Sequence, residues 1–109
     1  MIYLVSNQKQ LFTNEDYQEL SPEESLKMIL SWERVQFDTE TTGKDPHICS
    51  LLTAQFGNKK ANVQIVVDTT TVDFRIYKEV FETKLIIGHN LKFDCQFCYK
   101  YKIIPKFDW

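Results

Sequence analysis

The chain has 109 residues, of which 43% are hydrophobic and 26% charged; this is the composition of one small globular domain and excludes a disordered or collagen-like chain. Its formal net charge of −2, taken alone, gives no sign of a nucleic-acid binder, and its three cysteines, an odd number without framework spacing, argue against a disulfide scaffold. No apolar run nears the roughly 20 residues that span a bilayer, and the N-terminus lacks a signal-peptide pattern, so we expect a cytoplasmic protein without membrane contact.

The first third of the chain predicts a strand, a loop and a helix. Residues 2–5 form a short β-type run, and the polar stretch 6–19 that follows has no clear period. The segment 21–24, Ser-Pro-Glu-Glu, has the N-cap, the proline and the glutamate of a capping box. Apolar residues at helical spacing come next, so a helix is predicted over residues 22–32.

The middle of the chain predicts an antiparallel meander of three strands, at residues 35–39, 50–56 and 63–67. Successive side chains of a strand point to opposite faces of the sheet. In the first strand the apolar positions therefore share one face, and Asp38 and Glu40 share the other.

The last third predicts a helix, a strand, a second helix and a further strand. Asp73 is the expected cap of the first helix, whose apolar stripe is Phe74, Tyr77, Val80 and Phe81. Residues 85–87 are a wholly apolar strand, residues 91–101 a helix capped by Asn90, and residues 103–107 another strand. The order predicts an α/β fold with a mixed sheet and packed helices.

The pair Asp38 and Glu40 is the sharpest chemical feature. Two carboxylates side by side on one strand repel each other unless a cation or an arginine neutralises them. Their flanks carry uncharged threonine and glutamine and no adjacent basic residue, so a hard divalent cation with oxygen ligands is the natural partner. A solvated pair at a strand end is the alternative.

A second acidic segment follows the apolar strand at 85–87. Gly88, His89 and Asn90 form a predicted turn, and Asp94 lies one helical turn beyond Asn90 on the same face. Aromatic and apolar neighbours would make an unpaired carboxylate costly there. The alternative is a carboxylate held by the dipole at the helix N-terminus.

These two segments resemble motifs of a known family. The run Asp-Thr-Glu-Thr-Thr-Gly at 38–43 resembles the first motif of DnaQ-like (DEDD superfamily) 3′-5′ exonucleases, and Asn-Leu-Lys-Phe-Asp at 90–94 resembles the second. The likeness is strongest to the proofreading exonuclease domains of DNA polymerase I-like (family A) enzymes of bacteria and phages. It implies a ribonuclease H-like fold for residues 34–109, with residues 1–33 as a strand-and-helix extension. It also implies that the protein acts in a bacterial cell or a phage-infected bacterium.

The resemblance also implies the chemistry. Two divalent cations, Mg²⁺ or Mn²⁺, would be bound by Asp38, Glu40 and Asp94, the catalytic carboxylates, with Asp38 bridging both. The substrate would be the 3′ end of single-stranded DNA, held by Thr41, Thr42, Gly43 and Asn90. With those three acids neutralised, residues 35–109 would carry ten basic and six acidic groups, a formal charge of +4. This charge favours binding of a nucleic-acid phosphate backbone.

The family's third motif is missing from this pattern. It supplies a fourth carboxylate, usually four residues after a tyrosine or histidine. The one acid after Asp94 is Asp108, and position 104 is an isoleucine. We therefore expect a domain truncated before its third motif, weak or inactive alone, with the missing part of the domain or a downstream polymerase region as partner.

Other interpretations stay open. A non-catalytic nucleic-acid-binding or interaction domain would explain the missing fourth carboxylate, although it has no reason to keep three acids at one site. An RNA-trimming exonuclease is a third interpretation, since nothing in the sequence reads the sugar 2′ position. A zinc site from Cys95, Cys98, His47 and Cys49 is disfavoured because one pair lies in a helix of core residues, and His89 is expected in a turn rather than as a general base.

Overall fold

The computed structural model describes the chain in six segments, which are residues 1–7, 17–43, 51–88, 96–99, 101–104 and 107–108. The described strands form one mixed sheet of seven strands in the order β2-β1-β5-β4-β3-β6-β7. Their bounds are β1 (Ile2–Val5), β2 (Tyr17–Glu19), β3 (Arg34–Thr41), β4 (Leu51–Asn58), β5 (Val63–Asp68), β6 (Leu85–Ile87) and β7 (Phe107–Asp108). The labelled helices are α1 (Pro22–Leu30), the 3-10 helix η1 (Phe74–Tyr77) and α2 (Lys78–Thr83).

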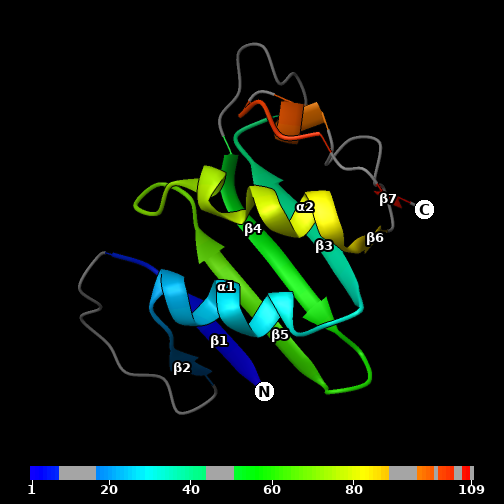
Figure 1. The fold of residues 1–109 in the computed structure, drawn as a ribbon. Helices are drawn as coiled ribbons and strands as arrows, with labels where there is room; N and C mark the ends of the chain where they lie inside the picture. Colours follow the sequence, from blue (N-terminus) through cyan, green and yellow to red (C-terminus); the bar gives the residue numbers. More distant parts are fainter. Residues whose placement is uncertain (8–16, 44–50, 89–95, 100, 105–106, 109) are drawn as a thin grey trace.

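Helices α1 and α2 cross the same face of the sheet (Figure 1). The inward side chains of the strands and of both helices form one hydrophobic core on that side. The opposite face of the sheet, which we call the open face, carries the alternate side chains of β1, β3, β4 and β5. None of the helices in the described part of the chain combines the length and apolar character needed to cross a membrane.

Helix α1 begins where the sequence predicts. The Ser21 hydroxyl accepts a hydrogen bond from the Glu24 N–H at 3.1 Å, and the Glu24 carboxylate accepts one from the Ser21 N–H at 3.2 Å, which confirms the capping box. The helix ends at Leu30, two residues before its predicted end. The Trp32 N–H still bonds to the Ile29 carbonyl at 3.0 Å, and the Trp32 side chain enters the core.

The antiparallel meander is present as β3, β4 and β5, with strand ends within two residues of the prediction. Its register places Phe37 opposite Phe56, and their ring centroids lie 5.3 Å apart. Phe81 of α2 packs on both rings, with centroids 4.9 Å from Phe37 and 6.0 Å from Phe56. This aromatic cluster fixes the part of β3 that precedes Asp38.

The helix predicted after Asp73 is present in two parts. The Asp73 carboxylate accepts a hydrogen bond from the Arg75 N–H at 3.0 Å and caps η1, which continues directly into α2. The predicted apolar stripe is confirmed because all four of its residues are buried, namely Phe74, Tyr77, Val80 and Phe81.

A buried hydrogen bond joins this helical segment to α1. The hydroxyl oxygens of Ser25 and Tyr77 lie 2.7 Å apart, and the Ser25 hydroxyl also donates to the Pro22 carbonyl at 2.7 Å. Because Ser25 uses its hydrogen on Pro22, the Tyr77 hydroxyl is the donor of the shared bond. Burial raises the pKa of Tyr77 to about 12 despite this bond, so the phenol stays protonated in neutral solution.

Replacing Tyr77 with phenylalanine is therefore expected to lower the free energy of unfolding by about 1 kcal/mol, the usual net value of one buried hydrogen bond. The ring contacts remain, and Ser25 keeps its bond to Pro22. Urea unfolding followed by circular dichroism measures the difference. Tyr99→Phe is the matched control because the Tyr99 side chain is 55% exposed; equal losses in both variants would contradict the assigned bond.

The N-terminal strand β1 lies inside the sheet, parallel to both β2 and β5. The loop predicted over residues 6–19 is wrong at its end, because Tyr17–Glu19 forms the edge strand β2. Three residues are too few to show an alternating pattern, and this strand is specified by pairing with β1 instead. Residues 8–16 lie outside the described segments.

A network of hydrogen bonds links the end of β1 to the end of β5. The Asp68 carboxylate accepts hydrogen bonds from the Ser6 hydroxyl at 2.9 Å, the Thr70 N–H at 3.1 Å and the Thr71 hydroxyl at 3.2 Å. The Asn7 side-chain amide also donates to the Thr71 carbonyl at 2.8 Å. Burial alone would raise the pKa of Asp68, but the hydrogen bonds from Thr70, Ser6 and Thr71 outweigh it and lower the pKa below its ordinary value of 3.8.

The depressed pKa gives stability a defined pH dependence. Asp68 binds protons more tightly in the unfolded chain, so its contribution is complete above pH 3.8 and is lost as the pH falls through the lower folded-state pKa. We expect Asp68→Asn to be less stable than the native chain at pH 6 and to lose less stability between pH 5 and pH 2. Urea unfolding at stepped pH tests this; parallel stability curves for the two proteins would contradict it.

The C-terminal part of the prediction is confirmed only in places. Residues 96–99 are helical, whereas residues 89–95, with Asn90 and the predicted helix start, lie outside the described segments. Residue Ile86 of β6 is fully buried between β3 and β7, as expected for an inner strand. Strand β7 pairs in parallel with β6.

The strand expected to begin at Ile103 is wrong at its start. The Ile103 N–H bonds to the Cys98 carbonyl at 3.0 Å and the Lys102 N–H to the Tyr99 carbonyl at 2.9 Å, with Lys102 at a left-handed φ of 61°. This pattern is a Schellman cap, in which the chain folds back over the helix end. Ile103 therefore packs into the core as part of the cap, and β7 begins only at Phe107.

Candidate functional site

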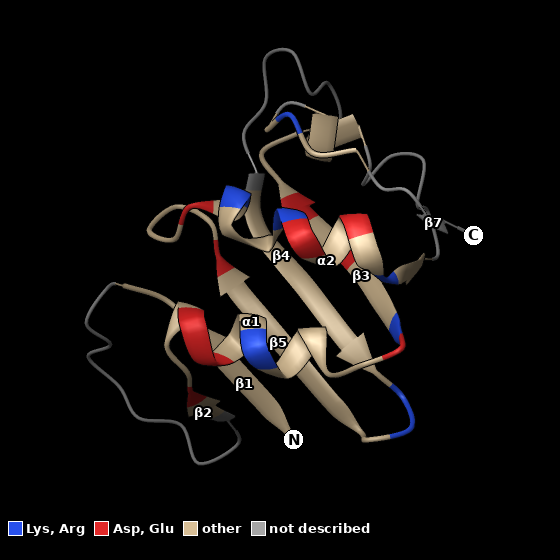
Figure 2. Cartoon of the chain, viewed as in Figure 1, with Lys and Arg blue, Asp and Glu red and all other residues tan. Residues whose placement is uncertain are grey.

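Strand β3 presents Asp38 and Glu40 on the open face. Val35, Phe37 and Thr39 point inward, with 0%, 2% and 9% of their surface exposed. Asp38 and Glu40 alternate with them and are exposed. The period-two pattern of the sequence thus predicted the shared face, and Figure 2 shows acidic positions near the end of β3.

No basic side chain of the described residues neutralises this pair. The ion pair found in the described segments joins Arg75 to Asp73 at 2.8 Å, on η1 and its cap. Within the described segments Asp38 accepts one hydrogen bond, from the Thr39 N–H at 2.9 Å. The two carboxylates therefore keep oxygens available for a ligand, and carboxylate oxygens are the donors that Mg²⁺ and Mn²⁺ take.

The chemistry of the two side chains fits a divalent cation, although the described residues do not gather three such groups. Asp94, the third predicted ligand, lies outside the described segments, as does Asn90. The disfavoured zinc site falls largely outside them too, since His47, Cys49 and Cys95 are among residues 44–50 and 89–95. Cys98 is fully buried in the core.

The pairing of β3 with β4 shifts register between Glu40 and Thr41, and such an irregularity re-aims the chain at the end of a strand. The Thr41 hydroxyl donates to the Gly43 carbonyl at 2.5 Å, which closes a tight turn. Three of the predicted substrate-binding residues, Thr41, Thr42 and Gly43, thus lie just beyond the acidic pair.

The sequence did not predict the residues that β4 and β5 place beside the acids. Gln55 lies opposite Asp38 in the register and Thr53 lies opposite Glu40. The Gln55 side-chain oxygen accepts a hydrogen bond from the Gln64 amide at 2.9 Å. The alternation within β4 places them on the open face, but the cross-strand register depends on the whole hairpin and no local signal gives it.

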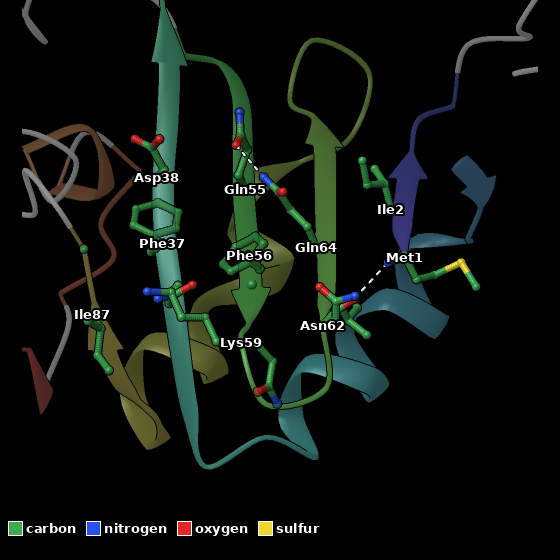
Figure 3. Close-up of a pocket in the computed structure, with 15 residues that line it drawn as sticks. Met1, Ile2, Phe37, Asp38, Gln55, Phe56, Lys59, Asn62, Gln64 and Ile87 are labelled. Atoms are coloured by element: carbon green, nitrogen blue, oxygen red, sulfur yellow. Dashed lines mark hydrogen bonds between the residues drawn. The ribbon is translucent and has the colours of Figure 1, made fainter. Parts of the chain in front are cut away.

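A hollow of about 750 Å³ lies over the open face. It runs from Asp38 past Gln55 and Gln64 to Lys59 and Asn62 near the turn between β4 and β5 (Figure 3). Figure 2 shows basic residues at that turn, where Lys59 and Lys60 are exposed. The hollow is thus acidic at one end, amide-lined along its length and basic at the other.

Solved structures show the same fold. The chain matches Brucella melitensis NrnC with a TM-score of 0.63 and 17% identity, over 99% of this chain and 48% of that one. It matches the EXO domain of Aedes aegypti Nibbler with a TM-score of 0.61 and 10% identity, over 92% and 44% of the two chains. The mixed sheet with its flanking helices is therefore ribonuclease H-like.

Sequence comparisons agree with the motifs. The chain is 29% identical to DNA polymerase I of Aquifex aeolicus (strain VF5) over 94 residues, which are 83% of this chain and 15% of that relative. It thus spans a small part of the relative's length. Residues 14–106 match the family model described as 3′-5′ exonuclease. This match covers both acidic segments and most of the sheet, and the chain therefore belongs to the 3′-5′ exonuclease family, whose members are phosphodiester hydrolases.

Proposed function

We propose that the chain is a metal-dependent exonuclease domain that shortens single-stranded DNA from its 3′ end. The observation that carries this proposal is the pair Asp38 and Glu40, which stand exposed on one face of β3 without a basic partner among the described residues. Two like charges are kept side by side where a cation relieves their repulsion. The family match supports the nuclease chemistry.

In this proposal Asp38, Glu40 and Asp94 hold two divalent cations, Mg²⁺ or Mn²⁺. When bound, such cations activate a water for attack on the scissile phosphate and stabilise the leaving 3′ oxygen. The role of the chain is to fix the carboxylates, and the buried Phe37 and Thr39 on either side of Asp38 do this by anchoring β3 in the core. No covalent nucleophile is required.

The proposed position of the 3′-terminal nucleotide is the turn that follows Glu40. Thr41 is the last residue of β3, after the shift in its pairing register, and Thr42 and Gly43 follow it directly. Asn90, whose place is outside the described segments, is proposed to approach the same nucleotide. A terminal nucleotide at this turn would have its phosphate next to the acidic pair.

We propose DNA as the substrate and a polymerase as the setting. The likeness to Aquifex DNA polymerase I, over 83% of this chain and 15% of that relative, supports both. A downstream polymerase region, or a further part of the exonuclease domain, is the proposed protein partner. The sequence offers three of the family's four carboxylates, so we expect slow turnover from this chain alone.

The test uses the chain in molar excess over a 5′-labelled DNA 20-mer with Mn²⁺. The expected result is a ladder of products shortened from the 3′ end, absent with EDTA and blocked when the 3′ terminus carries a phosphate. A parallel RNA 20-mer distinguishes the substrates, because faster shortening of RNA would overturn the choice of DNA. Internal cuts, or shortening from the 5′ end of a 3′-labelled strand, would overturn the exonuclease polarity.

A further inference from the structure

Thr53 of β4 has a buried hydroxyl oxygen for which the described structure offers no hydrogen-bond partner. Its neighbour Ala54 is fully buried on the core side, so Thr53 points to the open face. A buried hydroxyl without a partner destabilises the fold, and such groups in native proteins call for an explanation. One explanation is a hydrogen-bond partner that reaches the hydroxyl only when the site has bound its ligand.

Two carboxylates flank this hydroxyl in the sheet. The register places Thr53 opposite Glu40 of β3 on one side and opposite Asp68 of β5 on the other. Directly opposed side chains on one face have Cβ atoms about 4.5–5.5 Å apart, which is within reach of a hydroxyl and a carboxylate. Either acid is thus a possible acceptor by position.

Asp68 is already supplied with donors. Its Oδ1 accepts from the Thr70 N–H at 3.1 Å, and its Oδ2 accepts from the hydroxyls of Ser6 at 2.9 Å and Thr71 at 3.2 Å. Glu40 is exposed, and in the described part of the chain no hydrogen bond or ion pair holds its carboxylate. Of the two acids, Glu40 is therefore the one with oxygens to spare.

We propose that Thr53 is a positioning residue for Glu40. In the cation-loaded site the Glu40 carboxylate uses one oxygen as a ligand, and the Thr53 hydroxyl donates a hydrogen bond to the other. Partners of this kind orient ligating carboxylates and hold them in place for the cation. The inference rests on the proposed cation site at Asp38 and Glu40.

Thr53→Val tests the proposal because it removes the hydroxyl and keeps the shape of the side chain. Mn²⁺ titration followed by electron paramagnetic resonance of the free ion gives the affinity. We expect Thr53→Val to bind Mn²⁺ about 10-fold more weakly than the native chain and Thr53→Ser to bind like it. Thr83→Val, which removes an exposed hydroxyl on α2, is the control and should leave the affinity unchanged.

Thermal unfolding without metal separates positioning from structural support. Positioning predicts an unchanged or higher unfolding midpoint for Thr53→Val, because an unpaired buried hydroxyl is removed. If that variant unfolds, Thr53→Ala and Thr53→Ser provide the same comparison. Equal Mn²⁺ affinity with and without the hydroxyl, or an equal loss in Thr53→Ser, would overturn the inference alone. A native chain that binds no Mn²⁺ would overturn the proposed function first and the inference with it.

Discussion

Replacing Phe37 with alanine is expected to lower the free energy of unfolding by about 3–5 kcal/mol, as for other buried aromatic residues. The Phe37 side chain is 2% exposed, and its ring centroid lies 5.3 Å from Phe56, 6.1 Å from Phe74 and 4.9 Å from Phe81. Alanine would leave a cavity between the sheet and the helices η1 and α2. Because a small domain has only about 5–15 kcal/mol of stability, much of it would be lost.

Urea unfolding followed by circular dichroism measures this loss. Ile104→Ala is the control, because the Ile104 side chain is 66% exposed and its truncation should change stability by less than about 0.5 kcal/mol. A loss below about 1 kcal/mol for Phe37→Ala would mean that the aromatic cluster does not hold β3. The position of Asp38 would then need another cause.

Asp38→Asn is expected to reduce Mn²⁺-dependent shortening of single-stranded DNA by at least about 100-fold. Removing a group that only supports a metal ligand lowers metal affinity or activity by up to about 100-fold. Removing a direct ligand should lower it by at least as much. The substitution preserves the side-chain shape, and Asp38 is exposed, so the fold should be kept. The rate is measured with the protein in excess over labelled DNA.

Glu33→Gln is the matched control for this loss. Glu33 is an exposed acid that precedes β3, at the opposite end of the strand from the acidic pair. It should retain the native rate, which excludes a general effect of removing one negative charge. If Asp38→Asn kept the native rate, the activity would come from another site in the chain or from a contaminant of the preparation.

The sequence predicted the elements that depend on local signals. The capping box specified the start of α1 because its two hydrogen bonds lie within four residues, Ser21 to Glu24. The alternation in β3 predicted the face of Asp38 and Glu40 because burial of Phe37 on one side forces its neighbours to the other. These features need no knowledge of distant parts of the chain.

Features that depend on pairing between distant segments were missed. Strand β2 exists through its ladder with β1, and the position of Thr53 opposite Glu40 follows from the register of the whole β4 hairpin. The apolar side chain of Ile103 favours a strand, whereas the left-handed Lys102 makes it part of a helix cap. Hydrophobicity alone does not distinguish these two roles.

Binding of Mn²⁺ by the native chain, compared with Asp38→Asn and Glu33→Gln, is the most direct test of the claim that a cation belongs at the acidic pair. We expect saturable binding by the native chain and by Glu33→Gln, with an affinity at least about 10-fold weaker in Asp38→Asn. Identical titrations of the native chain and Asp38→Asn would contradict it.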